Sequence, residues 1–373
     1  MTPVAITGYA WSTPLGTGID EVWSALLQGK GGLGPVPSPH QLRNLDAGLA
    51  AGLDYTRTSP ADRIVYLARH GFSAVLENAG LDAAASTKRW AVVLGTSFGA
   101  SLDTEQGLFA WAEQSCAEFG LPAPVVLSTT CSSGVDAISV GRDLVLAGLA
   151  DVCLCGGIDV LTEAKRLGHS VLGTMSPHTV RSFDTSADGM LVSEGYGLVV
   201  LESDHHRRTR GGSVLGEMIG CGSSNDAAGL TELDPSGSYV ARAIGLALRE
   251  ADAEPSDVAV VSAHATGTTI NDYAEAHALG LAFGDTEPGP MVAATKGALG
   301  HSLGATGAVE LIVTLQMLRT RQVPPVLGLR EPRSELRLRV SATARTIEPG
   351  GDIGITVSLG FGGFNTCVVV RAT

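Results

Sequence analysis

Cys131 is the residue of this sequence whose position is most typical of a nucleophile. It lies between an apolar segment, PVVLSTT, and a helix expected to begin near Ser133. There the thiol would face free backbone N–H groups and the positive end of the helix dipole, which favours the thiolate. A strand-to-helix turn also exposes the side chain. The alternative is a buried structural cysteine, but Ser132, Ser133 and Gly134 are small and clear space for a substrate.

Two histidines have the chemistry to assist such a thiol. His264 ends the apolar segment VAVVSAH, at the strand edge where α/β folds place ligands. His301 lies in the glycine-rich turn KGALGHSLGATG, before an expected helix whose N-terminus should keep the ring neutral. A neutral imidazole can donate a hydrogen bond to a developing oxyanion. Either histidine alone could be structural, but with a cysteine they suggest thioester chemistry, with one thiolate and two donors for an enolate.

Two further features could complete the site. Lys296 needs a partner if it is buried, and Glu310 on the following helix is a candidate, with a surface ion pair as the alternative. The turn at 360–365, GFGGFN, places glycines on both sides of an aromatic residue. Glycine permits close backbone approach, so the N–H of Phe361 could form an oxyanion hole with the N–H of Cys131. A plain hairpin turn is the alternative.

The elements that must position these residues form a repeat. Segments 61–106 and 239–277 each read as an amphipathic helix, a loop, an apolar strand and a Gly-Thr pair. Each is followed by a strand, a Gly/Ser-rich turn and a long apolar helix. Segments 191–203 and 356–372 also resemble each other. Strands that alternate with helices predict βαβ units and parallel sheets.

This duplication predicts two similar α/β halves, residues 1–205 and 206–373, packed about an internal pseudo-dyad. Cys131 and His301 then occupy matching strand–turn–helix positions, and His264 a matching strand end. We therefore expect the three side chains to converge where the halves meet. A chance similarity between two ordinary α/β segments is the alternative.

Composition limits the cellular setting and the partners. The 373 residues are 44% hydrophobic and 17% charged, which is typical of a folded globular protein. A net charge of −13 argues against a nucleic-acid partner, and we expect the one dense basic run, 205–210, to be a solvated turn. No apolar run approaches the ~20 residues of a membrane span. The N-terminus has no secretory pattern and the six cysteines have no disulfide spacing, so we expect a cytoplasmic protein.

Several motifs resemble those of the β-ketoacyl-ACP synthase (ketosynthase) family. STTCSSG at 128–134 resembles its nucleophile motif, HATGTTIND at 264–272 its first histidine motif, and KGALGHSLGATGAVE at 296–310 its Lys/His motif. Blocks at 181–197 and 360–365 match as well, as does the initial VAITGYAWSTPLG. The resemblance covers nearly the whole chain.

The resemblance implies a thiolase-like duplicated αβαβα five-layer fold, in the α/β class, and a condensing acyltransferase of fatty-acid or polyketide type. Cys131 would take an acyl chain from acyl carrier protein (ACP). His264 and His301 would stabilise the enolate formed as malonyl-ACP loses CO₂, and Lys296 and Glu310 would organise the site electrostatically.

The resemblance also implies how substrates and partners bind. Thr266 and Thr268 would contact phosphopantetheine, and Phe361 would be a gate between acyl pocket and pantetheine channel. Substrates would arrive on the phosphopantetheine of ACP, so we expect no separate cofactor and no metal. The partner would be a second copy or a ketosynthase-like subunit of the chain-length-factor type.

Some residues depart from the family pattern. The connection 95–131 is shorter than usual, which predicts an altered acyl-pocket wall and a smaller dimer contact. Ala265 replaces a usual Gly, Leu359 a usual Phe and Phe364 a usual Thr, and Val357 stands where Asn is common. These departures favour secondary metabolism over housekeeping fatty-acid synthesis.

Three other functions fit part of the sequence. A non-catalytic chain-length-factor-like subunit would lack the nucleophile, yet Cys131 and both histidines are present. A thiolase acting on CoA esters would have a second cysteine in the C-terminal glycine turn, but Cys367 falls beyond it. A ketosynthase-like acyltransferase or cyclase that does not decarboxylate could carry identical motifs, so the sequence leaves it open.

Overall fold

The computed structural model describes residues 3–82, 89–284, 286–348 and 351–373. Their main feature is one ten-stranded sheet with the strand order β10-β9-β13-β14-β8-β1-β7-β6-β4-β5. These strands are β1 (Val4–Ser12), β4 (Trp90–Gly95), β5 (Val125–Leu127), β6 (Val152–Asp159), β7 (Gly195–Glu202), β8 (Gly216–Asn225), β9 (Val258–Ser262), β10 (Met291–Ala293), β13 (Ile353–Gly360) and β14 (Phe364–Arg371). Two small sheets pair β2 (Leu33–Pro35) with β3 (Asp46–Gly48) and β11 (Gln322–Val323) with β12 (Arg345–Thr346).

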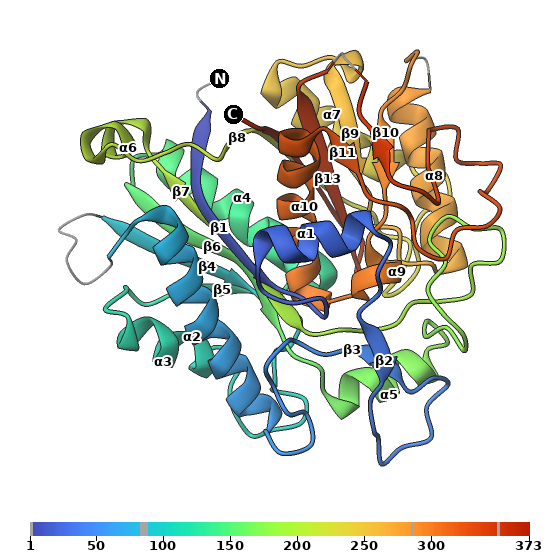
Figure 1. Cartoon of the computed structure of the whole chain (residues 1–373), viewed down its shortest axis with the longest axis horizontal. Coiled ribbons are helices and arrows are strands. Elements are labelled where there is room, and N and C mark those ends of the chain that lie inside the picture. Colours follow the sequence, from blue (N-terminus) through green and yellow to red (C-terminus); the bar gives the residue numbers. More distant parts are fainter. Residues whose placement is uncertain (1–2, 83–88, 285, 349–350) are drawn as a thin grey trace.

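The helices of the described residues lie around this sheet (Figure 1). They are α1 (Ile19–Leu27), α2 (Pro60–Ala79), α3 (Ala110–Glu118), α4 (Ser133–Leu146), α5 (Glu163–Val171), α6 (Asp204–Arg210), α7 (Ser238–Ala251), α8 (Thr269–Phe283), α9 (Lys296–Leu299) and α10 (Thr306–Thr320). Three 3₁₀ turns complete them: η1 (Thr130–Ser132), η2 (Pro255–Asp257) and η3 (Leu303–Ala305). None of the helices in the described ranges has the length and apolar content to cross a membrane.

The large sheet contains the same topology twice. In the first copy, the strands follow one another across the sheet as β1, β7, β6, β4 and β5, which are the first, fifth, fourth, second and third strands of that copy along the chain. In the second copy, β8, β14, β13, β9 and β10 follow the same order. The two copies join where β1 pairs with β8, from Val4 to Ile6. The predicted division at residue 205 falls within α6, between the copies, and no separate linker precedes β8.

The expectation of parallel sheets is wrong for part of each copy. The fourth strand runs parallel to the second, but it runs antiparallel to the fifth, as β6 does to β7 and β13 to β14. The reason is clearest between β13 and β14, where only residues 361–363 connect the strands. A connection that short reverses the chain, because parallel neighbours need a long crossover. Gly362 and Gly363, with φ of 87° and 83°, supply the left-handed turn.

Five layers result, as the resemblance predicted. Helices α2 and α3 share a hydrophobic cluster with one face of β4, β6 and β7. Helices α4 and α10 lie between the two copies and share the central cluster with strands of both. Helices α7 and α8 cover the far face of β9, β13 and β14. The α/β, thiolase-like αβαβα arrangement is therefore confirmed.

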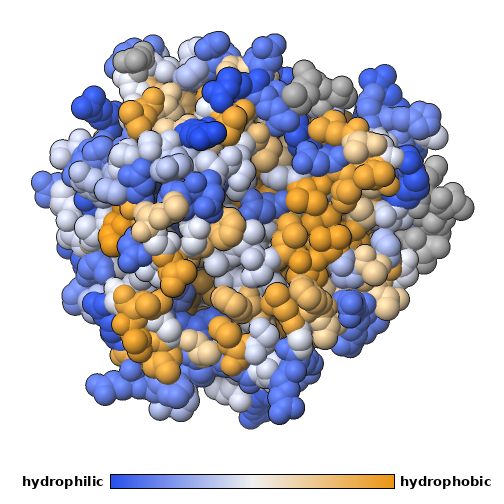
Figure 2. All heavy atoms as spheres, turned by 180° about the vertical axis from the view of Figure 1, so that it is seen from behind, coloured by the Kyte–Doolittle hydropathy of each residue, from blue (hydrophilic) through white to orange (hydrophobic). Residues whose placement is uncertain are grey.

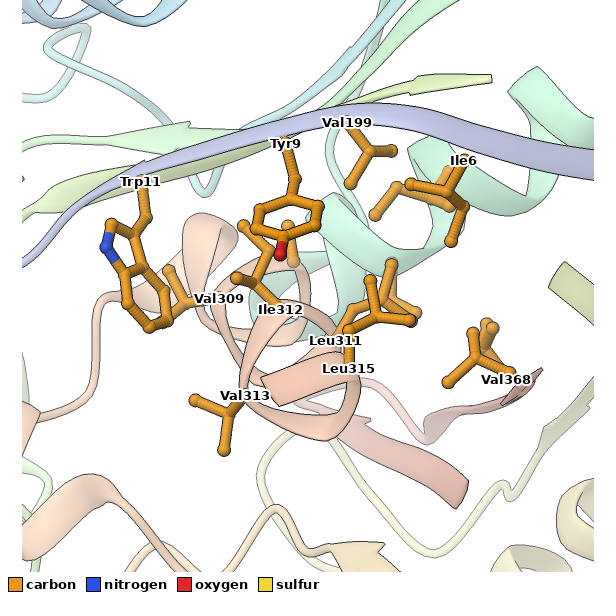
Figure 3. Close-up of a cluster of buried hydrophobic side chains, with 14 of the residues drawn as sticks. Ile6, Tyr9, Trp11, Val199, Val309, Leu311, Ile312, Val313, Leu315 and Val368 are labelled. Atoms are coloured by element: carbon orange, nitrogen blue, oxygen red, sulfur yellow. The ribbon is translucent and has the colours of Figure 1, made fainter. Parts of the chain in front are cut away.

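Helix α10 is buried on all sides from Thr306 to Leu318, which is typical of a helix in the middle of a core. Side chains of β1, including Tyr9 and Trp11, point toward it (Figure 3). Gln316 donates a hydrogen bond of 2.9 Å from Nε2 to the Tyr9 hydroxyl. This packing fixes the start of α10, and with it the preceding turn that carries His301.

The basic run at 205–210 is not a solvated turn. It forms most of helix α6, and two of its side chains fold back onto the buried carboxylate of Glu202. His206 Nδ1 lies 2.6 Å from Glu202 Oε2, and Arg210 Nε donates to that oxygen at 2.9 Å. The run is basic because it neutralises a buried acid at the end of β7.

Candidate active site

Cys131 lies in the 3₁₀ turn η1, directly before α4, where the sequence places it. Thr130 has a φ of 55°, so the chain turns sharply at the end of β5 and presents the thiol to a cavity of about 280 Å³. Burial raises the pKa of the Cys131 thiol to about 12, although the Lys296 ammonium and the Phe361 N–H act in the opposite direction. Burial therefore opposes the thiolate that the helix N-terminus favours, and the resting thiolate stays a prediction.

Both histidines meet Cys131 at the base of this cavity. The Cys131 sulfur and one ring nitrogen from each of His264 and His301 lie within 4.8 Å of one another. The two rings are nearly perpendicular, with centroids 5.2 Å apart. Burial, reinforced by the Lys296 charge, holds the pKa of both imidazoles well below the ordinary value, so both are neutral at pH 7.

The tautomer of His301 follows from its own turn. The backbone N–H of Leu303 donates to His301 Nδ1 at 3.1 Å, so the ring proton lies on Nε2. His301 can therefore donate a hydrogen bond from Nε2. For His264, Nδ1 is buried and has no hydrogen-bond partner among the described residues.

Lys296 and Glu310 form a buried ion pair, not a surface pair. The Lys296 ammonium also donates a hydrogen bond to the main-chain carbonyl of His264. Burial raises the pKa of Glu310 to about 7, and the neighbouring ammonium opposes this rise. The Lys296 ammonium of this pair is a positive charge that acts on both imidazoles.

Two acids that hold the His264 turn were missed by the sequence analysis. Glu275 accepts backbone hydrogen bonds from His264 and Ala265, each at 2.7 Å. Asp272 accepts the N–H of Gly267 at 3.1 Å and that of Phe183 at 2.6 Å. The available signal was their spacing, since residues three apart share a helix face.

The C-terminal glycine turn brings the N–H of Phe361 to the Cys131 sulfur, to which it donates a hydrogen bond. Thr130 Oγ1 in turn donates to the Phe361 carbonyl at 3.1 Å. A Cβ at Gly360 would lie 2.6 Å from Thr130 Oγ1 and 2.7 Å from the Thr129 carbonyl oxygen, so only glycine allows this approach. The N–H of Phe361 thus lies at the Cys131 sulfur, and its part in an oxyanion hole stays a prediction.

Thr266 and Thr268 line the same cavity as Cys131, with their hydroxyl oxygens 2.8 Å apart. The remaining wall is largely apolar and includes Leu172, Met190, Leu233, Ile270 and Phe361. A cavity that has a thiol at its base and hydroxyl groups along its wall can hold a thioester that is attached to a long, thin chain.

A thiol with two imidazoles is also a ligand set that Zn²⁺ accepts. Within the described part of the chain, Cys131, His264 and His301 form such a group. The buried Lys296 charge lowers the proton affinity of both imidazoles, and the same field opposes a metal cation. This argument supports the expectation that no metal binds here, which stays a prediction.

Comparison with known proteins agrees with the geometry. The model of the β-ketoacyl synthase N-terminal domain matches residues 1–207, and that of the C-terminal domain matches residues 215–330. The chain belongs to the β-ketoacyl synthase family. This ketosynthase is 31% identical to 3-oxoacyl-[acyl-carrier-protein] synthase 2 of Mycobacterium tuberculosis strain H37Rv, over 98% of this chain and 96% of that relative. It is 30% identical to a Streptomyces cyaneus protein named as a polyketide β-ketoacyl synthase, over 98% and 97%.

Solved structures show the same likeness. The ishigamide ketosynthase/chain length factor matches with a TM-score of 0.90 and 27% identity, over 100% of this chain and 99% of that one. A β-ketoacyl synthase from Burkholderia phymatum STM815 matches with a TM-score of 0.88 and 27% identity, over the full length of both. Like these proteins, this ketosynthase is an acyltransferase-type enzyme of fatty-acid or polyketide synthesis.

The ketosynthase is shorter than its relatives. Its alignment with the mycobacterial protein runs over 414 positions although the chain has 373 residues, so that relative carries segments without a counterpart here. In the interval 96–130, the structure has a loop, the short helix α3 and the three-residue strand β5. The strand expected at 124–130 is therefore shorter than predicted, because the chain already turns at Thr130.

Proposed function

We propose that this ketosynthase transfers an acyl group from ACP to Cys131 and then condenses it with malonyl-ACP as CO₂ is lost. The convergence of Cys131, His264 and His301 at the base of one cavity is the observation that carries the proposal. The catalytic roles below are assigned to these residues on that geometry.

In the first half-reaction, the Cys131 sulfur attacks the thioester carbonyl of acyl-ACP. The thiol is protonated at rest, and His264, a neutral imidazole within reach, takes the proton. The bond between the acyl carbon and the pantetheine sulfur breaks, and that sulfur leaves with the proton. The N–H groups of Cys131 and Phe361 hold the oxyanion of the tetrahedral intermediate.

In the second half-reaction, the bond between the malonyl carboxylate and its α-carbon breaks and CO₂ leaves. The electron pair moves onto the thioester oxygen, which accepts hydrogen bonds from His301 Nε2 and from His264. The α-carbon then attacks the acyl carbonyl on Cys131. Collapse of that intermediate expels the Cys131 thiolate and leaves a β-ketoacyl group on ACP. The thiolate then takes a proton from water, which restores the resting thiol. The Lys296 charge favours the enolate because little water screens it there.

We assign the phosphopantetheine arm to the cavity wall at Thr266 and Thr268. The relatives are named as acyl-carrier-protein synthases, which supports ACP as the carrier. The substrates then bring their own prosthetic group, and the proposed chemistry uses no other cofactor. All six cysteines are free thiols, which supports work in the cytoplasm.

We propose that a second ketosynthase-like chain packs against the edge strand β5. Val125 on this edge is 48% exposed, and the exposed apolar side chains of Phe98, Leu102 and Phe109 come from the same interval of the chain. Viewed from behind, the molecule has a broad hydrophobic area on the side of the N-terminal half, at the right of Figure 2. The ishigamide neighbour is a ketosynthase/chain-length-factor protein, which supports a partner of this type.

Intact-mass analysis of the purified chain with acyl-ACP and then malonyl-ACP tests the proposal. Expected are an acyl adduct mapped to Cys131 alone, CO₂ release, and a β-ketoacyl-ACP product, all absent in Cys131→Ala. Adducts at another cysteine that persist in Cys131→Ala would overturn the assignment. Acyl transfer without CO₂ loss would instead favour the acyltransferase or cyclase alternative.

A further inference from the structure

Helix α5 turns its charged side toward the interior. Its buried residues are Lys165 and Arg166, whereas Val171 at its end is 78% exposed and the following Leu172 is 57% exposed. A surface helix ordinarily buries its apolar side chains. The side that α5 turns toward the interior is therefore polar.

The Lys165 side chain is fully engaged. Its ammonium pairs with the Asp159 carboxylate and donates to the carbonyls of Gly99 at 2.6 Å and Val160 at 2.9 Å. Asp159 also accepts the backbone N–H of Gly304 at 2.9 Å, from the turn after His301. This pair fixes the position of α5 against the catalytic turn but leaves no donor for a substrate.

His169, one turn further along α5, is differently placed. Its Nδ1 lies 2.9 Å from the hydroxyl of Thr174, which lines the catalytic cavity. Its ring centroid lies 6.1 Å from that of Phe361, which also lines the cavity. No hydrogen bond reaches Nε2 from the described residues. The His169 ring therefore lies next to two residues of the cavity wall, Thr174 and Phe361.

The His169 ring is neutral at pH 7. Its side chain keeps some accessible surface, and burial lowers its pKa to about 4, with a further contribution from the Lys165 charge. A neutral ring has one nitrogen that donates a hydrogen bond and one that accepts. Because Nδ1 already lies beside the Thr174 hydroxyl, Nε2 is the nitrogen left for a ligand.

We propose that His169 is a specificity residue: its Nε2 hydrogen-bonds an oxygen on the acyl chain attached to Cys131, so that oxygenated chains are preferred to saturated ones. This inference rests on the proposed acylation of Cys131. The acyl chain reaches His169 when the Phe361 ring turns aside. A hydroxyl suits either tautomer of His169, because it both donates and accepts. A saturated chain leaves Nε2 buried without a partner, which costs about 10-fold or more in kcat/KM.

Acylation of Cys131 by matched thioesters of N-acetylcysteamine, a short mimic of the pantetheine arm, tests this. The probes are hexanoyl, 3-hydroxyhexanoyl and 5-hydroxyhexanoyl thioesters, and the readout is kcat and KM from mass spectrometry. The native enzyme should prefer one hydroxylated chain by about 10-fold or more. His169→Phe should abolish the preference and keep or improve hexanoyl transfer, whereas His169→Gln should keep part of it.

His178→Phe is the matched control, since His178 is an exposed histidine on the segment after α5. It should retain the native preference. Equal rates with all three chains in the native enzyme, or an unchanged preference in a folded His169→Phe, would overturn the inference while the proposed function stood. If His169→Phe does not fold, a full native preference in His169→Gln and in His169→Leu would overturn it equally. No acylation of Cys131 by any thioester or acyl-ACP would instead count against the proposed function.

Discussion

Lys296 donates a hydrogen bond from its ammonium to the main-chain carbonyl of His264. The same ammonium pairs with Glu310. Burial is the main reason that the pKa values of His264 and His301 are low, and the Lys296 charge lowers both further. Lys296 therefore contributes to both the positioning and the electrostatics of the site, beside Glu275, which holds the His264 backbone.

Lys296→Met should destabilise the protein by about 3–5 kcal/mol, because it leaves the Glu310 carboxylate buried without its partner. The double variant Lys296→Met/Glu310→Gln should recover most of that loss, since no lone charge remains. Neither variant should decarboxylate malonyl-ACP at the native rate. Denaturant unfolding and CO₂ release measure the two effects. A single variant as stable as the native protein would contradict the buried pair.

His264→Ala and His301→Ala should each slow decarboxylation by about 10²–10³-fold, because each removes one donor to the enolate. Acylation of Cys131 should remain substantial in His301→Ala, since the oxyanion hole and His264 are unchanged. It should be slower in His264→Ala, which also removes the group that takes the Cys131 proton. CO₂ release and the acyl mass shift separate the two steps. His205→Ala, at an exposed histidine on α6, is the control. Normal decarboxylation in both site variants would rule out the assigned roles.

Alkylation of Cys131 by iodoacetamide should accelerate steadily with pH. The thiolate is the reactive form, and burial raises the thiol pKa to about 12. The thiolate fraction therefore rises about tenfold for each pH unit between 7 and 9, provided that the protein stays folded. Peptide mapping distinguishes Cys131 from the other cysteines. A rate that is already level near pH 7 would show a resting thiolate, as the helix N-terminus alone predicts.

Ala265→Gly should change stability by no more than about 1 kcal/mol. Ala265 has a φ of 39°, where a non-glycine residue costs about 1–2 kcal/mol, and the buried methyl group returns a similar amount. Ala265→Val should cost about 3 kcal/mol or more, because it adds a β-branched side chain in a strained, fully packed position. Thermal unfolding of the native protein and of both variants measures these differences in stability. Equal stability of the two variants would argue against strain at this turn.

Val125→Lys should weaken self-association or binding to a ketosynthase-like partner, because it places a charge on the exposed edge of β5. Light scattering across a concentration series measures this. Leu281→Lys on α8, at a residue that is 64% exposed, is the control and should behave as the native chain. A tight dimer that survives Val125→Lys with an interface of full size would contradict both the edge assignment and the predicted small contact.

The sequence allowed the convergence of Cys131, His264 and His301 to be inferred because each lies at a strand end in a repeated pattern. Repetition of the strand order is what brings such ends together. The residues that hold these three side chains in place were harder to infer from the sequence. Glu275 and Asp272 resemble ordinary helix acids until their backbone partners are known. Lys165 and His169 resemble solvent-facing residues, because the helical pattern of α5 predicts that Val171 and Leu172 are buried. The Cys131 pKa depends on burial, which local sequence does not report.

Strand β1 is hydrogen-bonded to β7 along one edge and to β8 along part of the other. During translation, the edge facing β7 stays open until the ribosome has passed residue 202, and the edge facing β8 until it has passed β8. For most of the time that the chain is being made, an apolar strand is thus available to any neighbouring nascent chain. Chaperone capture of nascent chains stalled near residue 150 should therefore exceed capture of chains long enough for β8 to have left the ribosome.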